Sequence, residues 1–279
     1  MPEWRRITFS VTQPAQEDLI VRLHELGSLG VETVGPSLCA YFTSGIDETA
    51  LIRDVEQQLG GAARVRLVAS EPVKDGFWHE RWMEGLAPFV LGERFLVVPG
   101  PATPPDTLGR QVIRLTPGRA FGTGEHATTR MCVSLIERVV HPGDSVLDAG
   151  TGSGILSIAA RMLGGDPVVG IDIDETSVVV ASRNLAINAV DGVHLIAGTL
   201  EALQWRPFEV VVANINGSTL LRLMPSLSAL TRREAILSGI LKEEEREVAG
   251  AAARCGLTVT GRSVDGDWLA LTLSREPRG

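Results

Sequence analysis

The stretch Ser145–Asp174 has the sequence SVLDAGTGSGILSIAARMLGGDPVVGIDID, and it decides the fold that we expect. A short apolar run ends at Asp148, three glycines follow at every second position, and apolar residues then recur at helical spacing. A second apolar run, Val168–Ile171, ends at another acid, Asp172. The pattern predicts a strand, a tight turn, a helix and a second strand, which is half of a nucleotide-binding β-α-β fold.

The turn has the form D-x-G-x-G-x-G, with glycines at Gly150, Gly152 and Gly154. Glycine suits a tight strand-to-helix turn because it tolerates positive φ and lets a ligand approach the backbone. The dinucleotide fingerprint is G-x-G-x-x-G, whereas the third glycine comes one residue early here. An acid before the turn suits a cationic part of a ligand better than a phosphate. Asp172, at the tip of the next strand, can accept hydrogen bonds from a ribose diol.

This pattern resembles motif I of the class I S-adenosylmethionine-dependent methyltransferases. The resemblance implies that the methionine ammonium lies near Asp148, the sulfonium near the glycine turn and the ribose at Asp172. Thr199 and Leu200 follow the third expected strand, Val193–Ala197, where members of this class usually hold the adenine. A structural β-α-β unit in another α/β protein is the alternative.

Size and composition limit the classes of protein that need to be considered. The 279 residues allow one large domain or two modest ones. The net charge of −8 argues against broad binding to nucleic acid or to anionic membranes. Three cysteines lie far apart, which suits a reducing compartment and gives no metal signature. We see neither a signal peptide nor a membrane-spanning run, and we expect a cytoplasmic monomer.

Residues 1–72 predict a separate small domain with the ferredoxin-like order β-α-β-β-α-β. Its expected strands are Arg5–Val11, Val31–Val34, Leu38–Thr43 and Arg64–Val68, and its helices are Gln16–Leu26 and a segment from Asp47 to Leu59. This order hosts many functions, so a structural or oligomerising role stays open beside substrate recognition. Residues 73–88 are rich in Trp and Phe and predict a linker helix that packs on a domain or on a partner.

Residues 89–279 predict the catalytic domain, beginning with strands at Phe89–Val98 and Gln111–Leu115. The loop Thr116–Arg130 precedes the cofactor strand and is expected to line the site. Its candidate site residues are Phe121, His126, Thr128 and Thr129, although a lone Phe or His is more often structural. Asn214 ends the expected strand Phe208–Ala213 at the carboxyl edge of the sheet, where ligands bind, with a turn-forming Asn as the alternative. A hairpin around Asp265-Gly266 is expected to close the sheet.

Several stretches together resemble one family, PrmA, the methyltransferases of the eleventh large-subunit ribosomal protein in bacteria. They are FWHERWMEGLAPFVLGER, PGRAFGTGEHATT, VLDAGTGSGILSIAA, GIDID, VVANI and LSGIL, and they span Phe77–Leu241. The resemblance implies N-methylation of lysines and of the N-terminal α-amine on that protein. It carries the cofactor contacts onto Thr129, Gly150, Asp172 and Asn214, and it makes residues 1–72 the substrate-recognition domain. The sequence departs from the family's usual pattern at Thr116, Glu125 and Thr151.

The expected reaction is in-line displacement at the methyl carbon by a neutral amine. An apolar wall that includes Phe121 would favour the neutral form of a lysine. The Asn214 side chain or the Ile215 carbonyl could orient the amine, and His126 could accept its proton, although we assign no general base. The alternatives are methylation of another protein's lysine, a binding module without catalysis, and NAD-dependent oxidation, which the glycine spacing disfavours. A nucleic-acid base is also disfavoured, because Asn214 is followed by Ile-Asn-Gly rather than Pro-Pro and an aromatic residue.

Overall fold

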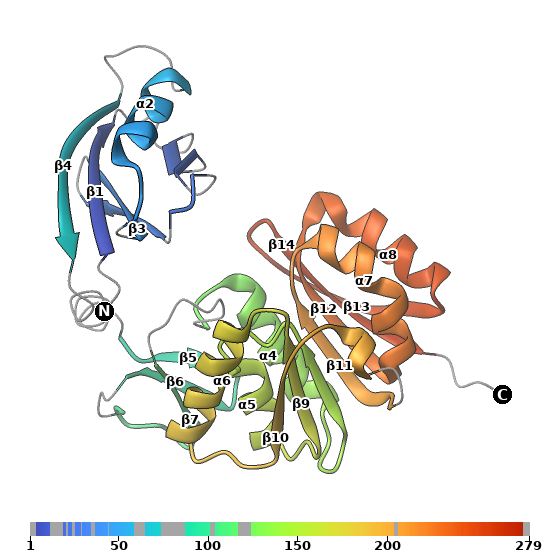
Figure 1. The fold of residues 1–279 in the computed structure, drawn as a ribbon. Coiled ribbons are helices and arrows are strands. Elements are labelled where there is room, and N and C mark those ends of the chain that lie inside the picture. The colour runs from blue at the N-terminus through green and yellow to red at the C-terminus, as the bar shows by residue number, and fades with distance from the viewer. Residues whose placement is uncertain are drawn as a thin grey trace. The chain divides into compact units, whose positions relative to one another are not determined.

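The computed structural model describes residues 4–11, 19–20, 22–23, 26–28, 30–34, 37–43, 45–58, 65–73, 87–100, 104–116, 124–203 and 206–275. The chain divides into two compact units, Met1–Gly85 and Leu86–Gly279 (Figure 1). The linker helix expected over residues 73–88 falls almost entirely outside the described residues. In the described parts of the chain, no helix is both long enough and apolar enough to cross a bilayer.

The first unit contains a four-stranded antiparallel sheet in the order β2-β3-β1-β4. Its elements are β1 (Trp4–Val11), β2 (Gly30–Val34), β3 (Ser37–Thr43), α2 (Glu48–Gln58) and β4 (Val65–Val73). Residues 19–20 and 22–23, within the first expected helix, are helical. Apolar side chains of the sheet and helices, among them Ile7, Phe9, Leu23, Phe42 and Leu51, form one buried core. All four strands expected from the sequence are present.

A small sheet opens the second unit, and here the sequence prediction was wrong in one respect. The expected single strand Phe89–Val98 is two antiparallel strands, β5 (Phe89–Leu91) and β6 (Phe95–Pro99). The chain turns at Gly92, and the Glu137 carboxylate accepts hydrogen bonds from the backbone N–H groups of the next two residues. This acceptor comes from a helix more than forty residues away, so local sequence could not reveal the turn. β7 (Gln111–Leu115) pairs parallel to β6.

The large sheet has seven strands in the order β10-β9-β8-β11-β12-β14-β13. Its strands are β8 (Val146–Ala149), β9 (Val168–Asp172), β10 (Val193–Ala197), β11 (Phe208–Asn214), β12 (Thr231–Leu241), β13 (Leu257–Asp265) and β14 (Trp268–Arg275). Strands β8 to β12 run parallel, and β14 pairs antiparallel with both β12 and β13. The predicted parallel sheet with a closing antiparallel hairpin is confirmed.

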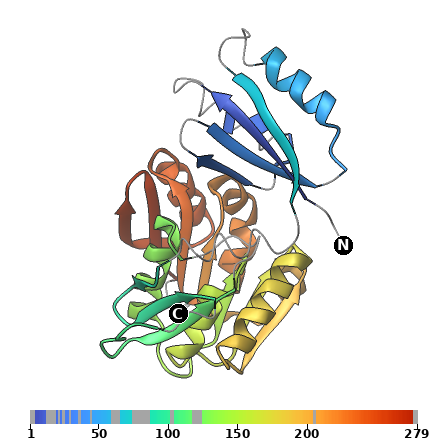
Figure 2. The same cartoon turned by 90° about the vertical axis from the view of Figure 1, so that its left-hand side faces the viewer.

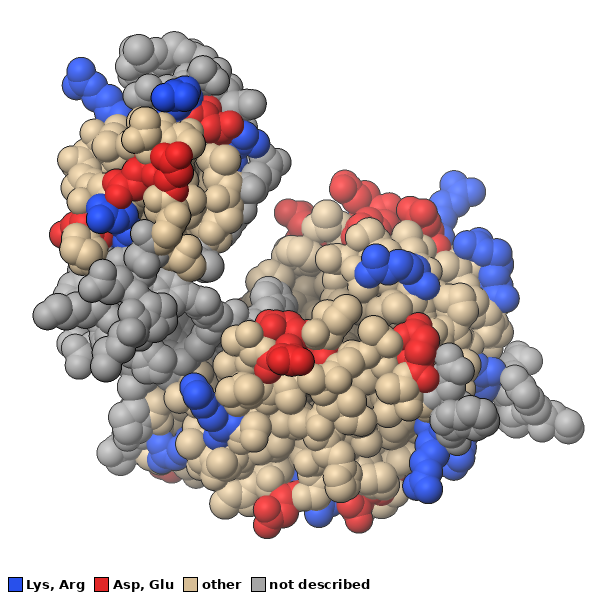
Figure 3. All heavy atoms as spheres, viewed as in Figure 1, with Lys and Arg blue, Asp and Glu red and all other residues tan. Residues whose placement is uncertain are grey.

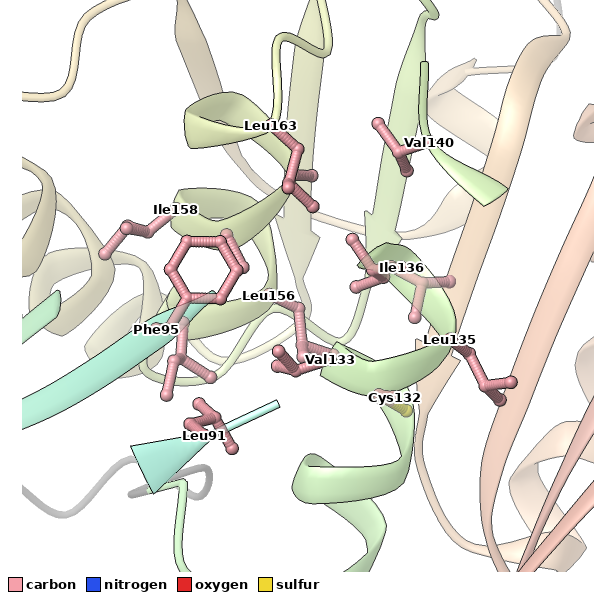
Figure 4. Packing of buried hydrophobic residues seen from close by; sticks show 14 of the residues in the cluster. Leu91, Phe95, Cys132, Val133, Leu135, Ile136, Val140, Leu156, Ile158 and Leu163 are labelled. Carbon is pink, nitrogen blue, oxygen red and sulfur yellow. The ribbon is translucent and has the colours of Figure 1, made fainter. Parts of the chain in front are cut away.

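Helices cover both faces of this sheet (Figure 2). The helical elements are α4 (Ala127–Val139), α5 (Ile155–Met162), α6 (Glu175–Ile187), η2 (Leu200–Leu203), α7 (Gly217–Leu230), η3 (Lys242–Glu244) and α8 (Glu245–Arg254). Alternate strand residues face opposite ways, so Val146 packs with α4, α5 and α6 while Leu147 packs with α7 and α8. Figure 4 shows the first core, where Phe95 of the small sheet meets Leu156, Ile158 and Val133. Because helices pack on both faces of the sheet, the parallel strands are held in place, and so are their carboxyl ends, where the candidate site lies.

Candidate functional site

A cavity of about 990 Å³ lies at the carboxyl ends of the parallel strands. Open α/β sheets bind ligands at this edge, beside the point where the strand order reverses. That point lies between β8 and β11 here. The described residues that line the cavity include His126, Thr129, Gly150, Gly152, Asp172, Ile173, Thr199, Leu200, Asn214, Ile215, Arg222, Leu223, Gly239 and Trp268. The site residues predicted from the sequence line this cavity, with two exceptions. Asp148 does not line it, and Phe121 is outside the described residues.

Asp148 is completely buried beneath the glycine turn rather than exposed to the cavity. Its Oδ2 atom accepts hydrogen bonds from the Thr151 hydroxyl at 2.7 Å, the Ser157 hydroxyl at 2.7 Å and the Ser157 N–H at 3.1 Å. Burial raises the pKa of this carboxyl to about 6, although the three donors oppose the shift. Oδ2 of this carboxylate holds the turn and the start of α5 together, whereas the buried Oδ1 accepts no hydrogen bond from the residues that the structure describes. Asp148 does not line the cavity, and a ligand ammonium near it stays a prediction.

Gly150 lets the turn close tightly over the end of β9. It has φ +79°, and the N–H groups of Gly150 and Thr151 both donate to the Ile171 carbonyl, at 2.8 and 3.0 Å. A Cβ at position 150 would lie 2.6 Å from Cγ2 of Ile215. Any side chain there would displace Ile215, so glycine is required by both the backbone conformation and the space.

Asp172 ends β9 with its carboxylate at the cavity wall. The Gly152 N–H donates to Oδ2 at 2.9 Å, and the Asp174 N–H donates to Oδ1 at 3.0 Å. A carboxylate oxygen has two lone pairs, so each oxygen can still accept a further hydrogen bond. This arrangement fits a ribose diol. Ile173, which we did not predict, lines the cavity next to it with 79% of its surface exposed.

The cavity continues past β10 to Thr199 and Leu200. Leu200 is buried and begins η2, and a hydrogen bond with the Thr199 side chain lowers the pKa of the neighbouring Glu201. The first turns of α7 complete this wall with Thr219, Arg222 and Leu223. Sequence reasoning missed the residues of α7, because their place depends on how that helix packs across the sheet edge. Apolar Leu200 and Leu223 beside polar groups are suited to a flat heteroaromatic ring.

Asn214 and Thr129 meet on the other side of the glycine turn. The Asn214 Nδ2 donates to the Thr129 hydroxyl at 3.4 Å, and Thr129 is completely buried in the first turn of α4. The Asn214 Oδ1 atom is buried and accepts no hydrogen bond from the residues that the structure describes. An unsatisfied buried acceptor is costly, which indicates that a ligand's donor completes it.

His126 caps α4, so it does more than line the cavity. Its Nδ1 accepts from the Thr128 N–H at 3.4 Å and lies 2.7 Å from the Thr128 hydroxyl. Desolvation, followed by the charge of Arg130, lowers the pKa of this imidazole, which keeps it neutral near pH 7. The ring packs edge to face with Trp268, with 4.9 Å between the ring centroids.

The strand order, the glycine turn over a buried acid and the carboxylate at the end of β9 define a class I S-adenosylmethionine-dependent methyltransferase. The family model of ribosomal protein L11 methyltransferase (PrmA) matches residues 3–276. The chain therefore belongs to the PrmA family.

Individual relatives agree with this assignment. The ribosomal protein L11 methyltransferase of Geobacter sulfurreducens is 39% identical over 85% of this chain and 81% of its own length. The Streptococcus pyogenes protein of the same name is 31% identical over 99% of this chain and 97% of its own. The crystal structure of a ribosomal protein L11 methylase from Lactobacillus delbrueckii subsp. bulgaricus matches with a TM-score of 0.64 and 33% identity, over 68% of this chain and 99% of that one.

Proposed function

We propose that this protein transfers methyl groups from S-adenosylmethionine to lysine side chains and to the N-terminal α-amine of ribosomal protein L11. The observation that carries the proposal is the pairing of a ribose-type acid, Asp172, with an unsatisfied buried acceptor, Asn214 Oδ1, across one glycine turn. The first suits a nucleoside and the second suits an N–H donor. Membership of the PrmA family supports the choice of L11 as the substrate.

The residues that line the cavity suit the parts of S-adenosylmethionine. Asp172 would hold the ribose hydroxyls, while Ile173, Leu200 and Leu223 would contact the adenine. The methionine portion would lie against the glycine turn at Gly150 and Gly152, which line the cavity together with Thr129 of α4. When bound, the cofactor supplies an electrophilic methyl group on a sulfonium.

The protein's part in the reaction is to hold a neutral amine in line with the bond between the methyl carbon and the sulfur. A lysine has a reference pKa of about 10.4, so reaching the neutral form at pH 7 costs roughly 4 to 5 kcal/mol. Apolar surroundings reduce that cost because they disfavour the charged form. Asn214 Oδ1 would accept an N–H of the amine and fix its lone pair toward the methyl group, and orientation of this kind supplies much of the acceleration. Phe121 stays a candidate for the apolar wall.

The first unit would recognise the substrate. Its strand order, which is β4-β1-β3-β2 from one edge of the sheet, supports a ferredoxin-like domain over residues 1–72 joined by a linker helix to the catalytic domain at 89–279. We propose a cytoplasmic monomer that does not bind nucleic acid directly. The face in Figure 3 supports the last point, since the Lys and Arg side chains of the described residues there lie among Asp and Glu rather than in one broad cationic patch.

The deciding experiment is intact-mass spectrometry of purified L11 after incubation with this enzyme and S-adenosylmethionine, followed by peptide mapping. Mass gains in steps of one methyl on lysine or on the α-amine would support the proposal. The absence of any gain, with cofactor binding still measurable by titration, would refute L11 as the substrate. The enzyme would then be tested on lysines of other proteins in a cell extract.

A further inference from the structure

Trp268 lies on the wall of the cavity, yet neither the sequence analysis nor the mechanism above gives it a role. It is the first residue of β14 and is partly buried against the core that contains α4 and α5. Its ring packs edge to face with His126 at 4.9 Å and an interplanar angle of 70°. These two rings form an aromatic wall, by which we mean the Trp268 and His126 side chains that line the cavity.

The register of the sheet places Trp268 of the aromatic wall farther than Asn214 toward the carboxyl edge of the sheet. Asn214 of β11 lies beside Ser238 of β12, whereas Trp268 of β14 lies beside Leu241 of β12. Ser238 pairs with Ala270 of β14, and Trp268 is two residues from Ala270, which is about 7 Å along a strand. Since β11 and β12 run parallel, this displacement is toward the carboxyl edge and the cavity mouth. A group entering from solvent toward Asn214 on this side would therefore pass the wall.

The aromatic wall is linked to helix α4, whose Thr129 contacts Asn214. Arg130 of α4 forms an ion pair of 2.6 Å with Asp265, which is the hairpin partner of Trp268. His126 caps the same helix, and Thr129 in its first turn contacts Asn214. The hairpin, the start of α4 and Asn214 are therefore connected by one series of contacts.

We propose that Trp268, together with His126, packs against the aliphatic stem of a substrate lysine whose amine lies at Asn214. This inference rests on the function proposed above. Lysine carries its amine on a flexible four-carbon stem, and such stems bury readily along apolar surfaces while the polar end reaches elsewhere. A tryptophan offers a large apolar face for that contact. Trp268 is then a residue that determines specificity: it favours lysine over an α-amine, which has no stem.

The test uses the full-length Trp268→Ala enzyme with L11 and S-adenosylmethionine, and it measures the two kinds of site separately by peptide mass spectrometry. We expect kcat/KM at lysine to fall at least tenfold, while methylation of the α-amine and the cofactor Kd each change less than threefold. Trp268→Phe should restore most of the lysine activity. An equal loss at both sites, or a large loss of cofactor affinity, would show that Trp268 supports the fold or the cofactor instead.

Two controls keep the outcome interpretable. Val264→Ala changes an exposed side chain of the same hairpin and should alter neither site. For the unaltered enzyme, a peptide with lysine should react better than the same peptide with a diamino acid of shorter stem, and equal rates would overturn the inference without any variant. If the unaltered enzyme methylates L11 but the variant keeps its lysine preference, only this inference fails, whereas no methylation of L11 at all refutes the proposed function.

Discussion

Gly239 and Ile215 touch through their main chains. Gly239 has φ +83°, and a Cβ at this position would overlap the carbonyl oxygen of Ile215. The β12–β14 register shifts between Ser238 and Ile240, and the Ile215 N–H donates to the Ser238 carbonyl at 3.1 Å. This irregularity in β12 allows the backbone of Ile215, which follows Asn214, to lie close to the backbone of Gly239. The positions of Asn214 and of the Ile215 carbonyl, which should orient the amine, therefore depend on the absence of a side chain at position 239.

Gly239→Ala should reduce methyl transfer far more than cofactor binding. The new methyl group would push the Ile215 carbonyl and the adjoining Asn214 out of place, and alanine at positive φ adds about 1 to 2 kcal/mol of strain. We expect kcat to fall at least tenfold, since small misplacements of positioning groups are costly. Cofactor titration should give a Kd within about threefold of the unaltered enzyme.

Gly266→Ala is the matched control for that variant. Gly266 also has positive φ, +59°, but no atom lies within 4 Å of the position of its Cβ. The substitution introduces the same kind of backbone strain without a collision, so the free energy of unfolding should fall while kcat stays unchanged. Equal losses of kcat in the two variants would mean that strain, and not the position of Ile215, explains the effect.

Asp172→Ala should weaken cofactor binding severely. Loss of hydrogen bonds to a charged acceptor costs about 1.5 to 3 kcal/mol each, so two ribose contacts predict a Kd increase of at least one hundredfold. Asp174→Ala is the control, because this acid is two residues away, caps α6 through the Thr176 N–H at 2.9 Å and does not line the cavity. That variant should lose about 1 kcal/mol of stability but keep its Kd. Calorimetric titration would separate the two, and an unchanged Kd in Asp172→Ala would refute the ribose assignment.

Asp148→Asn should change how stability depends on pH. The folded carboxyl has a pKa of about 6 against a reference value of 3.8, so the folded state binds the proton more tightly than the unfolded state. This stabilisation is complete below the unfolded pKa and is lost as pH rises through 6. When the pH falls from 7.5 to 4.5, the free energy of unfolding of the unaltered protein should rise by about 2 kcal/mol relative to that of the variant. Urea unfolding at several pH values would measure the difference, and a flat difference would contradict the raised pKa.

His126→Asn should leave the pH dependence of the reaction intact. Asparagine is also a good helix cap, so α4 should still begin at the same place. Since Nδ1 already accepts a hydrogen bond at the helix start, the neutral ring carries its proton on the other nitrogen and is poorly placed to act as a base. We expect kcat at the α-amine to fall less than tenfold. A loss of a hundredfold or more, together with a lost pKa in the rate profile, would establish His126 as the general base.

Much of the catalytic unit could be predicted from local sequence. The strand, glycine turn and helix at Ser145–Asp174 are specified by apolar runs of the right length, by glycines where φ is positive and by an acid at each strand end. The caps follow the same logic: Asp174 starts α6 and Asn216 starts α7 through their own side chains. These signals act over a few residues, so they can be recognised without knowledge of the fold.

Other features of the site were decided only when distant segments met. The Asn214 side chain meets the Thr129 hydroxyl, which lies 85 residues earlier in the chain. Trp268 reaches the cavity from the last strand, and the need for glycine at position 239 arises from the backbone of Ile215, which follows β11. The sequence by itself determined the order of elements, the glycine turn and the acids at the strand ends. The tertiary structure determined which side chains line the cavity, because neighbouring strands and helix α4 bring together residues as far apart as His126 and Trp268.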